Sequence, residues 1–203
     1  MTTYEGFDVF EDEPCREIRD DDFGRSMVRL DGGTGRIKYE IRDSEPMIVR
    51  PLRWVATSRA EIAALRAFLD ARKGRAVPFW MPTWDADLVL AADITPAATN
   101  IIIKSCGYTQ HLFPHPARRR LAIMVSPVEY AYRKVLAAVN NGDGTETLTI
   151  DSILGVSPAR DQTILSYLTL RRLHDDENEI MWRTAGVAEC TLRTVEIPTE
   201  VPA

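Results

Sequence analysis

Three side chains of the types that bind zinc lie close together, in the spacing C-x4-H-x3-H. They are Cys106, His111 and His115. A zinc site needs a fourth ligand or a bound water, and hydrogen bonds that orient the ligands. Three such residues within ten positions also occur easily by chance, and the flanking sequence GYTQHLFPHPA is typical of a loop bounded by prolines. We therefore expect an ordinary loop here rather than a metal site.

Two carboxylates beside a tryptophan form the second candidate for chemistry. Asp85 and Asp87 follow Trp84, and paired carboxylates catalyse glycoside hydrolysis. The rings of Trp80 and Trp84 could stack on sugars, or they could cover the base of a helix and a junction between two subdomains. Stacking requires exposed tryptophan faces, whereas packing buries them. We favour packing, and the exposure of the two rings tests this preference.

Other catalytic signatures are missing from the sequence. The chain has three histidines and no G-x-S-x-G motif, so a serine hydrolase of that type is not indicated. The glycine-rich stretch 31–35 lacks the helix and the Lys-Ser/Thr pair of a phosphate-binding loop, and no dinucleotide-binding fingerprint occurs. We expect a protein without enzymatic activity and without a cofactor.

The elements that position these residues centre on one predicted helix at residues 59–73. Ser58 and Glu61 form a capping box, in which each side chain satisfies a free backbone N–H. Arg72 and Lys73 complement the dipole at the C-terminal end, and glycine follows. One helix face and the extended aromatic segment after it carry the residues that we predict to pack on a sheet and at the junction: Ile62, Leu65, Phe68, Leu69, Phe79, Trp80 and Trp84.

Most of the remaining sequence has the period-two alternation of β-strands. In residues 36–42, Ile37, Tyr39 and Ile41 alternate with charged residues, which predicts a half-buried strand. This strand and the one before it flank the glycine-rich turn, and RDSEP forms the next turn. Residues 46–56 continue in β-like composition, and Pro51 places that strand on an edge or at a bulge.

Short strands are predicted in the middle of the chain and again after residue 163. The segments ATNIIIKS, RRLAIMVS, EYAYRKVLAAV and ETLTIDS alternate with proline-rich loops, and NNGDGT is a strong hairpin turn. We predict a small β-barrel or sandwich at residues 85–164. It is inserted into a mainly β domain made of residues 1–84 and 165–203. The last strands are joined by HDDEN, which we expect to be a solvated turn rather than a calcium loop.

Composition places the chain among ordinary globular proteins. Its 203 residues are 45% hydrophobic and 27% charged, with a net charge of −5. The acidic balance does not favour a nucleic-acid binder, and no apolar run is long enough to span a membrane. The three cysteines lie far apart and no signal peptide is recognisable, so we expect synthesis and folding in the cytoplasm.

The segments with these patterns resemble a known family. The stretch W-V-A-T-S-R-A-E-I-A-A-L-R-A-F-L-D-A-R-K-G, the following P-F-W-M-P-T-W-D and the C-terminal run from 165 to 198 look like the distal or minor tail proteins of long-tailed bacteriophages and prophages. The likeness covers residues 50–84 and 164–198, and elsewhere it rests on architecture alone.

The resemblance implies a fold and a role in assembly. The fold is a tail-tube-like β-sandwich or barrel flanked by one helix, with the second β domain inserted. The role is a structural virion component in the tail, a homohexameric ring that links the tail tube protein to the hub and surrounds the DNA exit channel without sequence-specific contact. Two alternatives remain: a carbohydrate-binding module at the tail tip, and a cell-wall glycoside hydrolase that uses Asp85 or Asp87.

Overall fold

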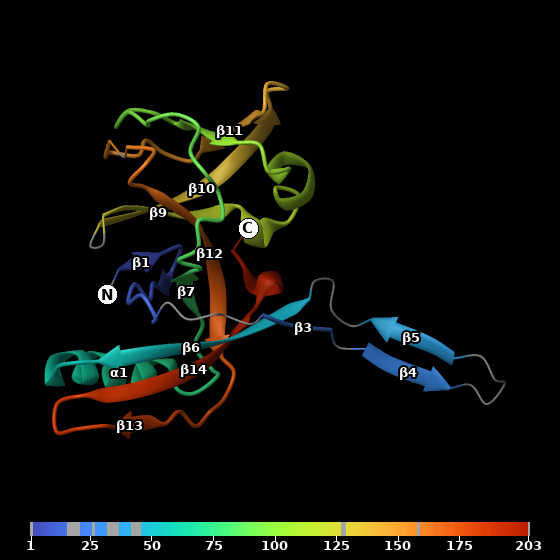
Figure 1. The fold of residues 1–203 in the computed structure, drawn as a ribbon. Coiled ribbons are helices and arrows are strands. Elements are labelled where there is room, and N and C mark those ends of the chain that lie inside the picture. Colours follow the sequence, from blue (N-terminus) through green and yellow to red (C-terminus); the bar gives the residue numbers. More distant parts are fainter. Residues whose placement is uncertain are drawn as a thin grey trace. The chain divides into compact units, whose positions relative to one another are not determined.

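The protein is mainly β, with one long α-helix, as predicted. A computed structural model describes residues 2–15, 21–25, 27–31, 37–41, 46–126, 129–157 and 159–202. The chain divides into two compact units, each of which we describe by itself (Figure 1). Unit 1 consists of Met1–Glu11, Trp80–Thr169 and Val201–Ala203, and unit 2 consists of Asp12–Phe79 and Leu170–Glu200.

The division differs from the predicted boundaries. We placed residues 1–84 and everything after 164 with the helix, but the first eleven residues belong to unit 1. There the backbone N–H of Phe10 donates to the carbonyl of Trp80 at 2.9 Å, and Val9 forms a parallel bridge with Trp80. Such pairing between residues seventy positions apart leaves no signal in local periodicity, which explains the error.

Unit 1 is built on antiparallel strands whose pairings form a ring. The order is β12 (Ile164–Leu173), β9 (Arg120–Ser126), β10 (Glu129–Asn140), β11 (Thr145–Ile150) and β8 (Asn100–Lys104). Residues 88–90 close the ring, because Leu88 bridges Leu165 and Leu90 bridges Ile103. Unit 1 is therefore a small closed barrel, one of the two architectures expected for this region.

The barrel interior follows from alternating strands. In β11 the buried residues are Glu146, Leu148 and Ile150, every second position. The predicted NNGDGT turn joins β10 to β11, and Gly142 and Gly144 adopt φ values of 78° and 87°. Smaller elements of unit 1 are β1 (Thr3–Tyr4), β2 (Phe7–Asp8), most of β7 (Phe79–Pro82), the π-helix η1 (Tyr108–Leu112) and the 3-10 turn η2 (Pro116–Arg118).

Unit 2 is a second antiparallel sheet covered by the helix. Strand β14 (Ala188–Glu196) pairs with β6 (Met47–Ala56) on one side, and on the other with β13 (Ile180–Trp182) and the last residues of β12. The short β3 (Asp22–Gly24) extends the sheet beyond β6, and η3 (Pro198–Glu200) follows β14. On this side of β6, β3 pairs at 47–49 and the Cys15 N–H donates to the carbonyl of Arg53 at 2.8 Å. No strand among the described residues pairs with Pro51 there, at the position where an edge or a bulge was predicted.

Helix α1 (Arg59–Arg72) lies where it was predicted, with two differences at its ends. The Glu61 N–H donates to Ser58 Oγ at 3.2 Å, but the Glu61 carboxylate accepts from Thr57 N at 2.8 Å, one residue before the expected donor. Arg72 was predicted to complement the helix dipole as a surface residue, but its side chain is buried. It is 2% exposed, donates to the carbonyl of Pro78, and lies 5.1 Å from the ring centroid of Phe68.

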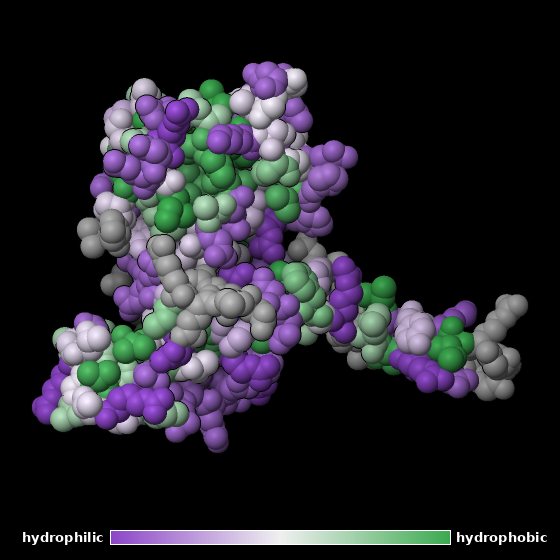
Figure 2. Space-filling model, viewed as in Figure 1, coloured by the Kyte–Doolittle hydropathy of each residue, from purple (hydrophilic) through white to green (hydrophobic). Residues whose placement is uncertain are grey.

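A two-stranded hairpin of unit 2 corrects another prediction. Strands β4 (Met27–Asp31) and β5 (Ile37–Ile41) pair with each other and with no other strand among the described residues. The predicted half-buried face is exposed: Ile37 is 44%, Tyr39 63% and Ile41 58% accessible. Figure 2 shows green hydrophobic patches among purple hydrophilic ones on the surface of this hairpin. The turns expected at 31–35 and 42–46 fall largely on residues 32–36 and 42–45, outside the described ones.

Candidate functional site

The helix and aromatic residues predicted to pack are buried. In unit 2, Ile62, Leu65, Phe68 and Phe79 are between 1% and 6% exposed, and Leu69 is half-buried. The rings of Phe68 and Phe79 meet edge to face with centroids 5.0 Å apart. This arrangement buries the apolar stripe of α1 against the residue that ends the connection to unit 1.

Trp80 and Trp84 present no face to a sugar. Their exposed fractions in unit 1 are 0% and 5%. Stacking on a sugar requires an exposed ring face, and neither tryptophan provides one. The indole N–H of Trp80 donates to the carbonyl of Tyr4 at 2.8 Å. Trp84 adopts a left-handed backbone conformation with φ of 55°, which turns the chain after β7.

The two aspartates next to Trp84 do not form a pair of available acids. Asp87 Oδ2 accepts hydrogen bonds from the backbone N–H of Tyr167, at 2.8 Å, and from the Thr83 hydroxyl. Burial raises the pKa of Asp87, and these two hydrogen bonds oppose the rise. Asp85 is exposed. The Asp87 carboxylate therefore fastens the 83–87 segment to β12, which is a structural use.

The C-x4-H-x3-H residues lie on the surface around η1. Cys106, His111 and His115 are all exposed. Within the part of the chain that the structure describes, no group of three or more His, Cys, Asp or Glu side chains could hold a metal ion.

A buried carboxylate that the sequence analysis did not single out organises this same loop. Glu146 is 0% exposed, and its Oε1 accepts from the backbone N–H groups of Cys106, Gly107 and Tyr108 at 2.9–3.2 Å. Its Oε2 accepts from the backbone N–H and the hydroxyl of Thr109, both at 2.6 Å. The carboxylate thus caps the start of η1 from the neighbouring strand β11.

The hydrogen bonds to Glu146 outweigh its burial. Burial alone would raise the pKa of a carboxyl, but the bonds from Thr109, Ser105 and Cys106 hold the pKa of Glu146 at about 2. The group is therefore ionised and fully engaged at neutral pH, and it is a structural anchor. The groups that donate to Glu146 lie in residues 105–109, about forty positions earlier in the sequence. Only the folded loop brings them to the carboxylate, so the sequence does not indicate this anchor.

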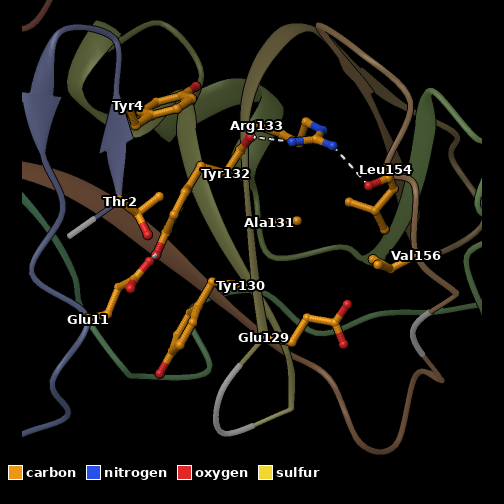
Figure 3. A pocket seen from close by; sticks show the side chains of 10 residues that line it. All are labelled: Thr2, Tyr4, Glu11, Glu129, Tyr130, Ala131, Tyr132, Arg133, Leu154 and Val156. Atoms are coloured by element: carbon orange, nitrogen blue, oxygen red, sulfur yellow. Dashed lines mark hydrogen bonds between the residues drawn. The ribbon is translucent and has the colours of Figure 1, made fainter.

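A pocket of about 460 Å³ in unit 1 is a candidate site for a small molecule (Figure 3). Its centre is strand β10, from which the rings of Tyr130 and Tyr132 project on the side of the N-terminal segment. These two rings are nearly parallel, with an angle of 10° and centroids 6.3 Å apart. The lining residues are Thr2, Tyr4, Glu11, Glu129, Tyr130, Ala131, Tyr132, Arg133, Leu154 and Val156.

Hydrogen bonds fix several groups around this pocket. The Tyr132 hydroxyl donates to Glu11 Oε1 at 2.6 Å, and burial, followed by this bond, raises the pKa of Tyr132 above its ordinary value. The Arg133 guanidinium donates to the carbonyls of Ile153 and Leu154, both at less than 3 Å. Tyr130 is half-buried and Glu129 exposed, so these two present an aromatic ring and a carboxylate to solvent. Such a mixture suits a neutral polyhydroxylated ligand.

Two further findings bear on the class of protein. No helix among the described residues is both long and apolar enough to cross a membrane. The sequence matches no protein-family model, and no curated protein is significantly similar to it.

Proposed function

We propose that the protein is a structural component of a bacteriophage tail, which assembles as a ring at the distal end of the tail tube. The tail tube protein and the hub or receptor-binding proteins are its partners. The ring surrounds the channel through which DNA leaves the particle. Net charge of −5 supports this role, because a negative wall repels phosphates and lets DNA slide.

The observation that carries the proposal is the hairpin β4–β5. The register places Met27, Ile37, Tyr39 and Ile41 on one face, and all four are more than 40% exposed. Arg29 and Asp31 lie on the same face and form an ion pair with each other. An isolated two-stranded hairpin is marginally stable in water, and alternating apolar residues are typical of a strand with one buried face. A neighbouring copy in the ring would cover this face, so the hairpin acts as an assembly arm.

The test is to place charges at the apolar positions of this hairpin face. Tyr39→Lys together with Ile41→Lys should leave the melting temperature within a few degrees of the wild type, because neither side chain is buried in the chain. Mass measurement over a range of concentrations, with negative-stain imaging, should show a ring with a central hole for the wild type and smaller species for the variant. Lys38→Glu with Glu40→Lys, on the opposite face, is the matched control.

Two results would contradict the proposal. One is a wild-type protein that stays monomeric at every concentration, alone and with purified tail tubes. The other is a Tyr39→Lys/Ile41→Lys variant that forms the same rings as the wild type.

A second candidate function is saccharide binding at the pocket of unit 1. The supporting observation is the Tyr130–Tyr132 pair beside Glu129, because sugars bind to aromatic rings bordered by carboxylates and hydroxyls. Binding to a glycan array, lost on Tyr130→Ala and kept on Tyr39→Ala in the hairpin of unit 2, is the expected result. An array with no signal above background for the wild type would remove this candidate.

A further inference from the structure

Two grooves flank helix α1 in unit 2, and their charges are opposite. The first, of about 260 Å³, lies toward β6 and is lined by Asp12, Glu13, Trp54, Val55, Ala56, Glu61, Ala64 and Leu65. The second, of about 310 Å³, lies toward β13 and is lined by Arg59, Ile62, Ala63, Arg66, Trp182 and Ala185. We call them the acidic groove and the basic groove.

The charges within each groove have one sign. Among the residues that the structure describes, every charged residue that lines the acidic groove is a carboxylate, namely Asp12, Glu13 and Glu61. Both charged residues that line the basic groove are arginines, and Arg66 lies 5.5 Å from the ring centroid of Trp182. Both grooves also have apolar walls: Trp182 is 47% exposed, and Val55 36%. Apolar walls with a charged rim are typical of protein interfaces.

The grooves lie on opposite sides of the same layer. On the helix, the buried residues Ile62, Leu65 and Phe68 separate Glu61 and Ala64 from Arg59, Ala63 and Arg66, as the 3.6-residue period requires. In the sheet, β14 pairs with β6 on the acidic side and with β13 on the basic side. One copy can therefore present its acidic groove to one neighbour and its basic groove to the next.

We infer that the acidic groove of one copy docks on the basic groove of the next copy. This inference rests on the proposed ring and names the contact that builds it. Two-fold pairing through either groove would bring like charges together, which is unfavourable. Head-to-tail pairing brings opposite charges together at each contact, and a head-to-tail contact closes into a ring when its rotation allows.

Charge reversal on one groove at a time gives the test. Variant A is Arg59→Glu with Arg66→Glu, and variant B is Asp12→Lys with Glu13→Lys; Glu61 is left intact because it caps α1. Each variant alone should associate about tenfold more weakly than the wild type at low salt. An equimolar mixture of A and B should regain assembly, because both kinds of contact then again join opposite charges. The chain that carries all four changes should also assemble by itself.

The controls separate folding from docking. Asp70→Lys and Lys73→Glu reverse charges near the end of α1, on residues that line neither groove, and should not change association. Circular dichroism of A and B should match the wild type. Misfolded chains would not regain assembly when A and B are mixed. Regained assembly in the mixture therefore supports docking even if one variant is less stable than the wild type.

Each outcome discriminates between the two proposals. A wild type that forms rings while A and B associate within about twofold of it would overturn the docking of the grooves and leave the ring proposal standing. The same holds if the mixture is no better than either variant alone. A wild type that never assembles would overturn both.

Discussion

The barrel of unit 1 and the hairpin of unit 2 have the same local pattern and opposite surroundings. In β11, Leu148 and Ile150 alternate with threonines and are 0% and 2% exposed. In β5, Tyr39 and Ile41 alternate with charged residues and are 63% and 58% exposed. The alternation specifies which side chains share a face, but that face is buried only if other strands pack against it. The barrel finds that cover within its own chain, whereas among the described residues no strand covers the face of the hairpin.

The largest expected effect is a charge in the barrel. Ile123 is 0% exposed, and Ile123→Asp should cost about 4 kcal/mol or more, enough to unfold unit 1. Tyr39→Asp, the matched change in the hairpin, should alter the free energy of unfolding by less than about 0.5 kcal/mol. Denaturant unfolding followed by circular dichroism measures both. Equal losses from the two variants would show that the hairpin face is covered within the chain.

The same reasoning applies to the helix of unit 2. Leu65 is 6% exposed, so Leu65→Asp should lose about 3–4 kcal/mol and abolish assembly together with folding. The neighbouring Ala67→Asp, on the exposed side of α1, should change little beyond helix propensity. Wild-type-like oligomers from Leu65→Asp would contradict the packing role of this helix face.

A smaller effect is expected from the one charged residue on the inner face of β11. Glu146→Gln should cost about 3 kcal/mol, because either orientation of the amide places its NH2 donor against backbone N–H groups, that of Thr109 or those of residues 106–108. Hydrogen exchange should speed up at residues 106–109. Glu129→Gln, an exposed position in the same unit, is the control for the loss of a negative charge. Unchanged exchange in Glu146→Gln would refute the anchoring role.

The pH dependence of stability should report the same group. The folded-state pKa of Glu146, about 2, lies below the ordinary value of 4.5. Its contribution is therefore complete above about pH 4.5 and is lost as the pH falls toward 2. The loss amounts to about 2–3 kcal/mol. Unfolding free energies at pH 6 and pH 3 should differ less in Glu146→Gln than in the wild type, and an equal difference would exclude Glu146 as the source.

The smallest expected effect concerns the end of α1. Gly74 has a φ of +64°, and a Cβ at this position would lie 2.7 Å from Asp176 Oδ1. Gly74→Ala should cost about 1–2 kcal/mol in unfolding free energy, through backbone strain and a weaker contact between Arg75 and Asp176. Gly155→Ala has a similar φ but open space, so the difference between the two variants isolates the contact with Asp176. Equal losses would assign the whole effect to the backbone.

Local patterns in the sequence predicted the elements well and their partners poorly. The helix, its serine cap, the strands from β8 to β14 and the NNGDGT turn follow from periodicity and turn chemistry. The closure of the barrel by Leu88 and Leu90 does not, since it depends on two bridges between distant residues. In the HDDEN turn Asp176 and Glu177 are exposed, as expected for a solvated turn, and Asp176 also accepts from the backbone N–H and guanidinium of Arg75.

The candidate sites show the same limit. Burial of Trp80 and Trp84 follows from their place after an amphipathic helix. The pocket around Tyr130 does not, because it requires Thr2, Tyr4 and Glu11 to reach β10 from the other end of the sequence. The buried positions of Arg72 and Arg120 also escape prediction, since arginine usually lies on the surface. Arg120 is balanced by Glu5, 115 residues away.

The membership of residues 2–11 and 201–202 in unit 1 has a consequence for synthesis on the ribosome. The carbonyl of Pro202 accepts from Arg120, and Trp80 pairs with Val9 and Phe10, so unit 1 combines segments that are far apart in the sequence. Unit 1 can therefore complete these contacts only after residue 202 has been synthesised, and a fragment of residues 80–169 would lack β1 and β2. In unit 2, β6 can form its pairing with β14 only after residues 188–196 have been synthesised.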